Sequence, residues 1–403
     1  MDGMVRTPAE AAPAVAAGER LEMAENQISE AVRATGQGFV LCGSSSLALD
    51  FIRGAASEAV VVGHGLILFG LANLPSLQNS GVVVFFLMSG FIIPYSSFMK
   101  ARKDSTYGFG SYFIDRFSRI YVGFVPGLAC VLLLDVISQG YFPGEYAYSD
   151  AFDVKTFVGN LLMLQDHPIF DVAAKLTAGT SWLTSFGSAR PFWTVAIEWW
   201  IYMVFGLMAF STRRWRRSPV YWLALAVVAI GPAYNLVGGR GNGLSVMWGA
   251  GLLIYLLMAR YPFLLSKERA LAAGLALVVV AMARLVWART PYDVLYALLL
   301  AGAMYFILSA IQAGNAHVSR WIFVPIKAVS DYSYTLYLVH YSVLVFLAHW
   351  NGEVPGGVLF VIGFVASNVI SAILFVLFEC RYRSVAARLK QVFILREPRG
   401  SVS

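Results

Sequence analysis

The feature that most constrains this chain is a series of apolar runs, each near 20 residues long, that recurs from about residue 54 to residue 378. A helix needs about 20 apolar residues to cross a bilayer, and in lipid only helices or closed barrels satisfy every backbone group. The sequence therefore predicts an all-α, polytopic membrane helix bundle with about ten transmembrane helices. The ten runs are 54–74, 81–99, 117–138, 192–210, 220–237, 243–259, 270–288, 292–312, 333–350 and 355–378.

The composition excludes several other classes of protein. Hydrophobic residues make up 58% of the 403 residues and charged residues 13%, against about 25% charged in soluble proteins. A soluble enzyme, a disordered protein and a disulfide scaffold are therefore excluded. The net charge of +7 is typical of a membrane protein with basic cytoplasmic loops and does not indicate nucleic-acid binding. Cys42, Cys130 and Cys380 have neither zinc nor disulfide spacing, so we expect no metal site.

The basic residues predict the orientation, because loops rich in Lys and Arg stay in the cytoplasm. They concentrate after every second run, so both termini are expected in the cytoplasm of a multi-pass protein of the cell (inner) membrane. These clusters are Lys100, Arg102, Lys103, Arg116 and Arg119; Arg213, Arg214, Arg216 and Arg217; Arg260, Lys267 and Arg269; Arg320 and Lys327; and the C-terminal tail from Arg381 to Arg399.

Three segments flank or interrupt the expected membrane domain, residues 48–385. Residues 1–47 are expected to be a flexible cytoplasmic segment, because residues 1–36 are polar and rich in Ala and Glu. They are not expected to be a signal peptide, since they lack a basic start followed by an apolar core. Residues 139–191 form a long, acidic and aromatic extracytoplasmic loop, and a loop of this length is usually functional. Its apolar part, 154–165, is too short to span and is expected to lie along the interface or to re-enter. Residues 386–403 form a basic cytoplasmic tail.

Ionisable residues inside apolar runs are costly and mark candidate functional sites. Arg53 and His64 are eleven residues apart, about three helical turns, so they share one face with an axial offset of ~16 Å. The plainer alternative is a snorkelling arginine and a histidine bonded within the bundle. The remaining ionisable residues are Glu58, Asp135, Glu198, Arg284, His340, His349 and Glu379.

Two further motifs lie near the predicted cytoplasmic side. Arg116 and Arg119 are at i, i+3 and share a helix face, where they either set topology or clamp phosphate oxygens with their fork-shaped donors. Ser89 interrupts an apolar run next to Gly90. This pair indicates either close helix packing or a hydroxyl in a pocket wall.

Two later motifs combine aromatic and ionisable residues. Thr194, Glu198 and Tyr202 form one stripe at four-residue spacing beside Trp193. They indicate a functional carboxylate, with a structural ion pair or an interfacial aromatic belt as alternatives. A second stripe either lines a pocket or packs; its members are Tyr334, Tyr337 and His340 or Tyr341.

In this order the motifs resemble the acyltransferase 3 family of bacterial membrane O-acyltransferases, over about residues 48–383. Thr194 stands where the family commonly has Ser, and Cys380 follows Glu379 where the family often has Pro. Glu58 has no counterpart in the pattern and no assigned role. The matching positions are Leu49, Asp50, Arg53, Gly54 and Ala56; His64; Phe85 to Phe91; Arg116 and Arg119; Trp193, Thr194, Val195, Glu198 and Tyr202; and Ser333, Tyr334, Tyr337 and His340.

The resemblance implies transfer of an acyl group, usually acetyl, from cytoplasmic acyl-CoA to a hydroxyl of a carbohydrate such as an O-antigen, exopolysaccharide or lipo-oligosaccharide. His64 is the expected general base or acyl carrier, and Glu198 is expected to orient its imidazole or stabilise its cation. The CoA phosphates are expected at Arg53, Arg116 and Arg119. The expected pocket residues are Ser89, Trp193, Thr194, Tyr202, Tyr337 and His340. Acyl-CoA is then a substrate, with no bound cofactor. A transporter or exporter of a small acid or sugar is the alternative.

Overall fold

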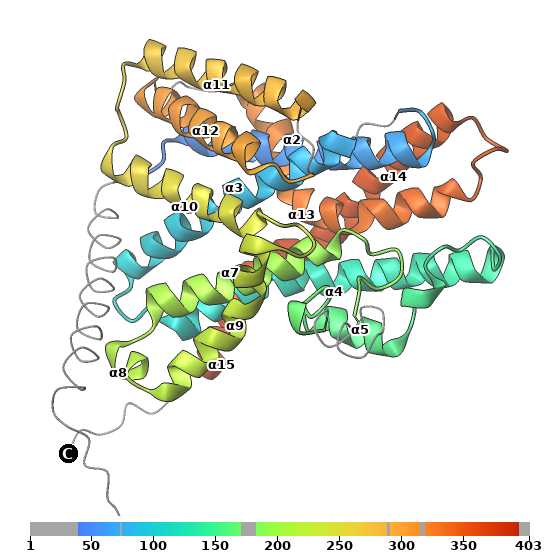
Figure 1. The fold of residues 1–403 in the computed structure, drawn as a ribbon, viewed down its shortest axis with the longest axis horizontal. Helices are drawn as coiled ribbons and strands as arrows, with labels where there is room; N and C mark the ends of the chain where they lie inside the picture. Colours follow the sequence, from blue (N-terminus) through green and yellow to red (C-terminus); the bar gives the residue numbers. More distant parts are fainter. Residues whose placement is uncertain (1–38, 73–74, 171–182, 288–290, 315–318, 395–403) are drawn as a thin grey trace, which may run out of the picture.

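The computed structural model describes residues 39–72, 75–170, 183–287, 291–314 and 319–394. The described parts of the chain are helical and carry no β-strand (Figure 1). The long helices are α2 (Gly43–Leu68), α3 (Pro75–Lys103), α4 (Phe109–Tyr141), α7 (Phe192–Phe210), α9 (Pro219–Val237), α10 (Leu244–Arg260), α11 (Lys267–Trp287), α12 (Val294–Gly314), α13 (Arg320–Ala348) and α14 (Gly356–Leu377). Shorter ones are α5 (Val154–Leu161), α8 (Arg213–Arg216) and α15 (Tyr382–Phe393), with 3₁₀ turns at Ser149–Ala151 and Glu379–Arg381.

The predicted polytopic helical bundle is confirmed, since eight described helices are long and apolar enough to cross a membrane. The ten predicted runs correspond to ten helices. Two of these fall outside the eight. Helix α10 has only 17 residues. Helix α13 has 29 residues and carries Arg320, Lys327 and Asp331 in its first half.

Helices α2 and α13 form the centre of the bundle. Helix α2 packs between α3 and α13, and α13 also contacts α4 and α14. Helix α3 meets α10 very closely, because a Cβ at Gly90 would lie 2.0 Å from the carbonyl oxygen of Trp248. Gly251 on α10 faces the same contact. The Gly90 motif therefore serves close helix packing, one of the two functions predicted for it.

The outer surface of the bundle is apolar. Large side chains such as Leu223 on α9, Val279 on α11 and Val376 on α14 are more than 60% exposed. In water such surfaces would be unfavourable, whereas lipid tails solvate them. Many buried polar side chains instead lie on the inward faces of α2, α4, α7 and α13; they include Ser57, Asp135, Thr194, Thr335 and His340.

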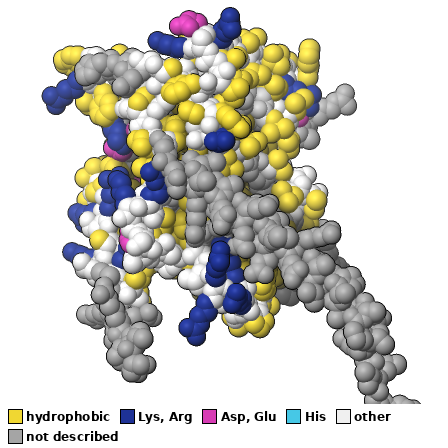
Figure 2. All heavy atoms as spheres, turned by 90° about the vertical axis from the view of Figure 1, so that its left-hand side faces the viewer, with side chains coloured by type: hydrophobic (Ala, Val, Ile, Leu, Met, Phe, Trp, Pro, Cys, Tyr) yellow, Lys and Arg dark blue, Asp and Glu magenta, His cyan; other side chains and the backbone are white. Residues whose placement is uncertain are grey.

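The two ends of the bundle differ in charge. We call the end where α3 stops and α4 starts the basic end, because it carries Lys100, Lys103 and Arg116, together with the arginines of α8. Figure 2 looks onto it and shows Lys and Arg side chains at several places, with few acidic ones. The end where α2 stops and α7 starts is the opposite end. The predicted orientation places the basic end in the cytoplasm.

The flanking segments expected from the sequence are described only in part. Residues 1–38, 171–182 and 395–403 lie outside the described residues. The start of the expected C-terminal tail forms α15, which packs on α4 and pairs Lys390 with Asp115 at 2.7 Å. The apolar part of the long loop contains the short helix α5, whose N-cap Asp153 accepts a hydrogen bond from the Thr156 amide.

Candidate active site

Two histidines from distant parts of the sequence meet inside the bundle. His64 lies on α2 and His340 on α13, and His64 Nδ1 is 3.0 Å from His340 Nε2. The two imidazoles are stacked, with ring centroids 5.3 Å apart. His340 is fully buried, and its Nδ1 lies 2.9 Å from the carbonyl oxygen of Leu336, one helical turn earlier.

This chain of contacts determines which nitrogen of each ring carries hydrogen when both rings are neutral. A carbonyl oxygen only accepts, so His340 Nδ1 must donate to Leu336. Neutral His340 then has a lone pair on Nε2, which accepts a hydrogen bond from His64 Nδ1–H. The lone pair of His64 therefore remains on Nε2. That nitrogen has no hydrogen-bond partner among the described residues.

His64 lines a cavity of about 270 Å³ at the opposite end of the bundle. This volume is near the lower bound of about 300 Å³ that is common for small-molecule sites. The cavity thus places a candidate base beside a space for a ligand. Its other lining residues are Ile67, Leu68, Gln78, Asn79, Val82, Arg190, Pro191, Trp193, Arg240, Tyr292, Tyr337 and Tyr341.

Three of the predicted pocket residues build one wall of this cavity. Tyr337 and Trp193 line it directly. Thr194 lies behind them, donates to the Pro191 carbonyl at 2.9 Å, and lies 2.6 Å from the Tyr337 hydroxyl. The Tyr337 hydroxyl also lies 3.4 Å from the Pro191 carbonyl, so these three groups form one hydrogen-bonded cluster. A serine hydroxyl would make the same hydrogen bonds. The presence of Thr194 where the family commonly has Ser therefore leaves this arrangement unchanged.

No hydrogen bond or ion pair joins Glu198 to His64 within the described residues. The hydrogen-bond partner of His64 there is His340. The Glu198 carboxylate instead accepts a hydrogen bond from Tyr202, one turn later on α7. Ser89 is within hydrogen-bonding reach of the same carboxylate, and Arg116 and Arg119 are within electrostatic reach of it. The predicted stripe of Glu198 and Tyr202 therefore lies near Arg116 and Arg119 of α4.

Two of the predicted arginines lie together on α4 with different partners. Arg119 pairs with the fully buried Glu379, which also accepts a hydrogen bond from Thr335. Its guanidinium is 5.0 Å from the Tyr382 ring centre. Arg116 is buried, has no carboxylate partner within the described residues, and its Nε has no hydrogen-bond partner there. Arg116 is therefore the less neutralised of the two cations.

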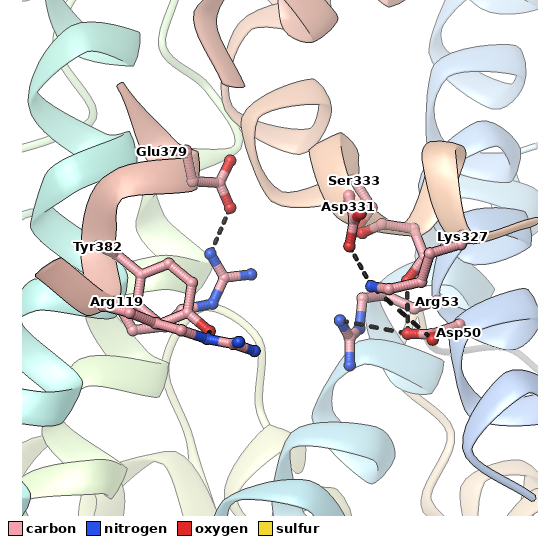
Figure 3. A network of polar contacts seen from close by, with 10 residues as sticks. Asp50, Arg53, Arg119, Lys327, Asp331, Ser333, Glu379 and Tyr382 are labelled. Atoms are coloured by element: carbon pink, nitrogen blue, oxygen red, sulfur yellow. Dashed lines mark hydrogen bonds and ion pairs between the residues drawn. The ribbon is translucent and has the colours of Figure 1, made fainter. Parts of the chain in front are cut away.

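Arg53 faces this pair from α2. Its guanidinium lies 3.9 Å from Asp50, and Lys327 of α13 lies 3.9 Å from the same carboxylate. Figure 3 shows this cluster on one side and the Arg119, Glu379 and Tyr382 cluster on the other. Arg53 and Arg119 are close enough to interact electrostatically. The three arginines, predicted from two motifs, thus converge toward one region of the basic half.

Several residues of the site were not predicted as site residues from the sequence. Arg190 and Arg240 lie outside the basic clusters that predicted the cytoplasmic side, yet both line the cavity. The signal for Arg190 was its position directly before the Trp193 motif. Glu58 lies half-buried elsewhere on α2 and accepts a hydrogen bond from Asn368 of α14 at 3.3 Å.

Comparison with protein-family models identifies the family of this chain. The model described as an acyltransferase domain matches residues 46–377, most of the chain. The chain belongs to the acyltransferase 3 family. It is therefore an enzyme, a membrane acyltransferase that transfers groups other than aminoacyl groups. Searches of curated proteins and of solved structures each gave no match.

Proposed function

We propose that this acyltransferase moves an acyl group, in the simplest case acetyl, from acyl-CoA at the basic end to a carbohydrate hydroxyl at the opposite end. Membership of the family supports acyl transfer. The single observation that carries the proposal further is the contact between His64 and His340 beside a cavity. The proposed acceptors are surface saccharides such as an O-antigen, an exopolysaccharide or a lipo-oligosaccharide.

In the proposed reaction His64 acts as the general base. Its Nε2 takes the proton from the acceptor hydroxyl as the oxygen attacks the thioester carbon. Collapse of the tetrahedral intermediate breaks the C–S bond, and the CoA thiolate leaves and takes the proton from His64. Through its Nδ1–H bond to His340, the imidazolium keeps its orientation during the step. His340 thus positions His64, much as a buried acceptor orients the histidine of a hydrolase triad.

In a second route, His64 Nε2 attacks the thioester carbon and the C–S bond breaks with release of the CoA thiolate. The acceptor hydroxyl then displaces the imidazole from the acyl group, and its proton passes to the released thiolate. On this route an acyl-imidazole would form before any acceptor is present. Rapid quenching of the purified enzyme with labelled acetyl-CoA alone distinguishes the routes. Label on the protein supports the carrier route, and label that stays on CoA supports direct transfer.

The donor phosphates are assigned to Arg53, Arg116 and Arg119. Guanidinium groups bind phosphate oxygens through paired donors, and these three lie in the basic half of the bundle. Helical geometry puts Arg53 ~16 Å from His64 along α2, a distance over which the pantetheine arm would extend. Glu198, within electrostatic reach of Arg116 and Arg119, acts here as a positioning residue.

Radiolabelled acetyl-CoA tests the proposal in membranes that contain the enzyme. Label should move to glycan with the wild-type protein and should fail to move with His64→Ala. Immunoblotting and extraction with detergent establish that the variant is inserted in equal amount. Normal transfer by an inserted His64→Ala protein would overturn the assignment, and flux of substrate without transfer would contradict acyltransferase activity.

A further inference from the structure

The cavity beside His64 is positively charged. Arg190 and Arg240 both line it, and its described lining residues include no Asp or Glu. An unpaired guanidinium near a membrane carries a free-energy cost, so such a group usually has a partner or a function. The partners of these two arginines therefore indicate what the cavity receives.

Arg240 already has partners. It donates to Asp166 at 2.8 Å, and its guanidinium carbon lies 4.7 Å from the Trp193 ring centre. Arg190 has no carboxylate partner within the described residues, and its recorded side-chain contact is with the Tyr148 ring, at 5.9 Å. Of the two cavity arginines, Arg190 is therefore the one whose charge has no carboxylate partner within the described residues.

The backbone that carries Arg190 is held rigidly in place. Asp135 of α4 accepts hydrogen bonds from the Ser188 amide at 2.9 Å and the Ser188 hydroxyl at 2.5 Å. Gly187 has φ of +49°, and a Cβ there would lie 2.1 Å from Asp135 Oδ2. We call this contact of Asp135, Gly187 and Ser188 the loop anchor. It keeps Arg190 at the cavity, as expected for a preorganised binding group.

The rest of the lining suits a sugar ring. Trp193, Tyr292, Tyr337 and Tyr341 supply aromatic surface, and Gln78 and Asn79 supply amide groups. Apolar and aromatic walls with a few polar groups are usual for small-molecule sites. A guanidinium adds selectivity for carboxylate or phosphate oxygens.

We propose that the acceptor is an anionic saccharide, whose carboxylate or phosphate pairs with Arg190 while a nearby hydroxyl faces His64. This inference rests on the proposed function and names the class of its acceptor. Arg190 is then a specificity residue. A role in stabilising the oxyanion of the transition state would instead affect neutral and anionic acceptors equally.

Equilibrium binding tests the inference without requiring turnover. The probes are methyl glucuronoside, methyl glucoside and glucose 6-phosphate, and ligand-observed NMR measures their affinity for the full chain in nanodiscs. We expect the wild type to bind at least one anionic probe at least tenfold more tightly than methyl glucoside. Arg190→Gln should reduce that preference to less than twofold. Lys155→Gln, which removes an exposed charge of α5 at the same end, should keep it.

The results separate this inference from the proposed function. A wild-type protein that binds neutral and anionic probes equally, or binds none of them, overturns the anionic acceptor. Retention of the preference by Arg190→Gln overturns it as well. Failure of the proposed function has a different signature, since labelled acetyl-CoA would then give no His64-dependent transfer while anionic binding persisted. Preference for only one anionic probe identifies the charged group as carboxylate or phosphate.

Discussion

His64 Nδ1 and His340 Nε2 lie 3.0 Å apart although 276 positions separate them in the sequence. The contact exists because α2 packs directly on α13. It extends to the Leu336 carbonyl through the second nitrogen of His340, so one backbone oxygen fixes the tautomers of two neutral rings. For the proposed reaction, the consequence is a lone pair on Nε2 of His64, a residue that lines the cavity.

Replacement of His64 should lower the rate of transfer strongly. His64→Ala removes the proposed base, and general base catalysis contributes about 10²–10⁴-fold to the rate. We expect the rate of acetyl transfer to fall by roughly this factor, with acyl-CoA affinity unchanged. Steady-state transfer and acetyl-CoA binding measure the two quantities. His349→Ala is the matched control, since His349 bonds only to the Phe346 carbonyl among its recorded hydrogen bonds.

His340 should be replaceable only by a side chain that accepts a hydrogen bond at the same place. His340→Ala leaves His64 Nδ1–H without its acceptor, and we expect kcat to fall about 10-fold to 100-fold. His340→Gln places an amide oxygen near the former Nε2 and should restore most of the activity. Equal loss in both variants, measured at equal protein levels, would contradict a positioning role.

Arg116 should contribute more than Arg119 to donor binding, because Glu379 already neutralises Arg119. A charge-assisted hydrogen bond is worth about 1.5–3 kcal/mol. Arg116→Gln should therefore raise the KM for acetyl-CoA about 10-fold to 100-fold, with little change in kcat. Lys103→Gln removes an exposed charge at the same end and should leave KM unchanged. An unchanged KM in Arg116→Gln would remove the phosphate assignment.

Replacement of Glu379 should lower the stability of the protein more than its affinity for acyl-CoA. Its loss leaves Arg119 without its carboxylate partner, and breaking a buried ion pair costs about 3–5 kcal/mol. Because the Arg119 side chain is 26% exposed, we expect a loss near the lower value, ~3 kcal/mol. Thermal unfolding in detergent should show a lower Tm for Glu379→Gln. The double variant with Arg119→Gln should recover part of the loss, because no unpaired guanidinium remains.

The loop anchor should tolerate no side chain at Gly187. Gly187→Ala would place a Cβ 2.1 Å from Asp135 Oδ2 at a φ of +49°, so the loop must shift. We expect weaker binding of the anionic probe and an unfolding cost of about 1–3 kcal/mol. Gly144→Ala is the control, since a Cβ there meets no atom within 4 Å. Unchanged binding and Tm in Gly187→Ala would show that the anchor does not position Arg190.

Helix α5 should lose stability in acid. The Thr156 amide bonds to the Asp153 carboxylate and holds its pKa below the ordinary value. Such a carboxylate stabilises the fold above its unfolded pKa of about 3.9, and this contribution is lost as the pH falls through the lower folded pKa. Asp153→Ala should cost about 1 kcal/mol locally at pH 7, whereas Asp153→Asn keeps a capping oxygen. Hydrogen exchange of the α5 amides measures the effect.

The helical membrane architecture and the family could both be predicted from the sequence. Apolar runs of membrane-spanning length leave helices as the way to satisfy the backbone in lipid. The ordered motifs that include Arg53, His64 and His340 were local enough to be recognised. The face shared by Arg53 and His64 followed from helical periodicity alone.

Which of these residues meet depends on how the helices pack against one another. Glu198 was expected beside His64, but helix packing puts His340 there and leaves Glu198 with Tyr202. Arg190 lies just before α7, and Arg240 lies between α9 and α10. The packing of these three helices brings both arginines to one cavity. Periodicity fixes the direction of a side chain within its own helix, whereas contacts between helices depend on how distant faces pack together.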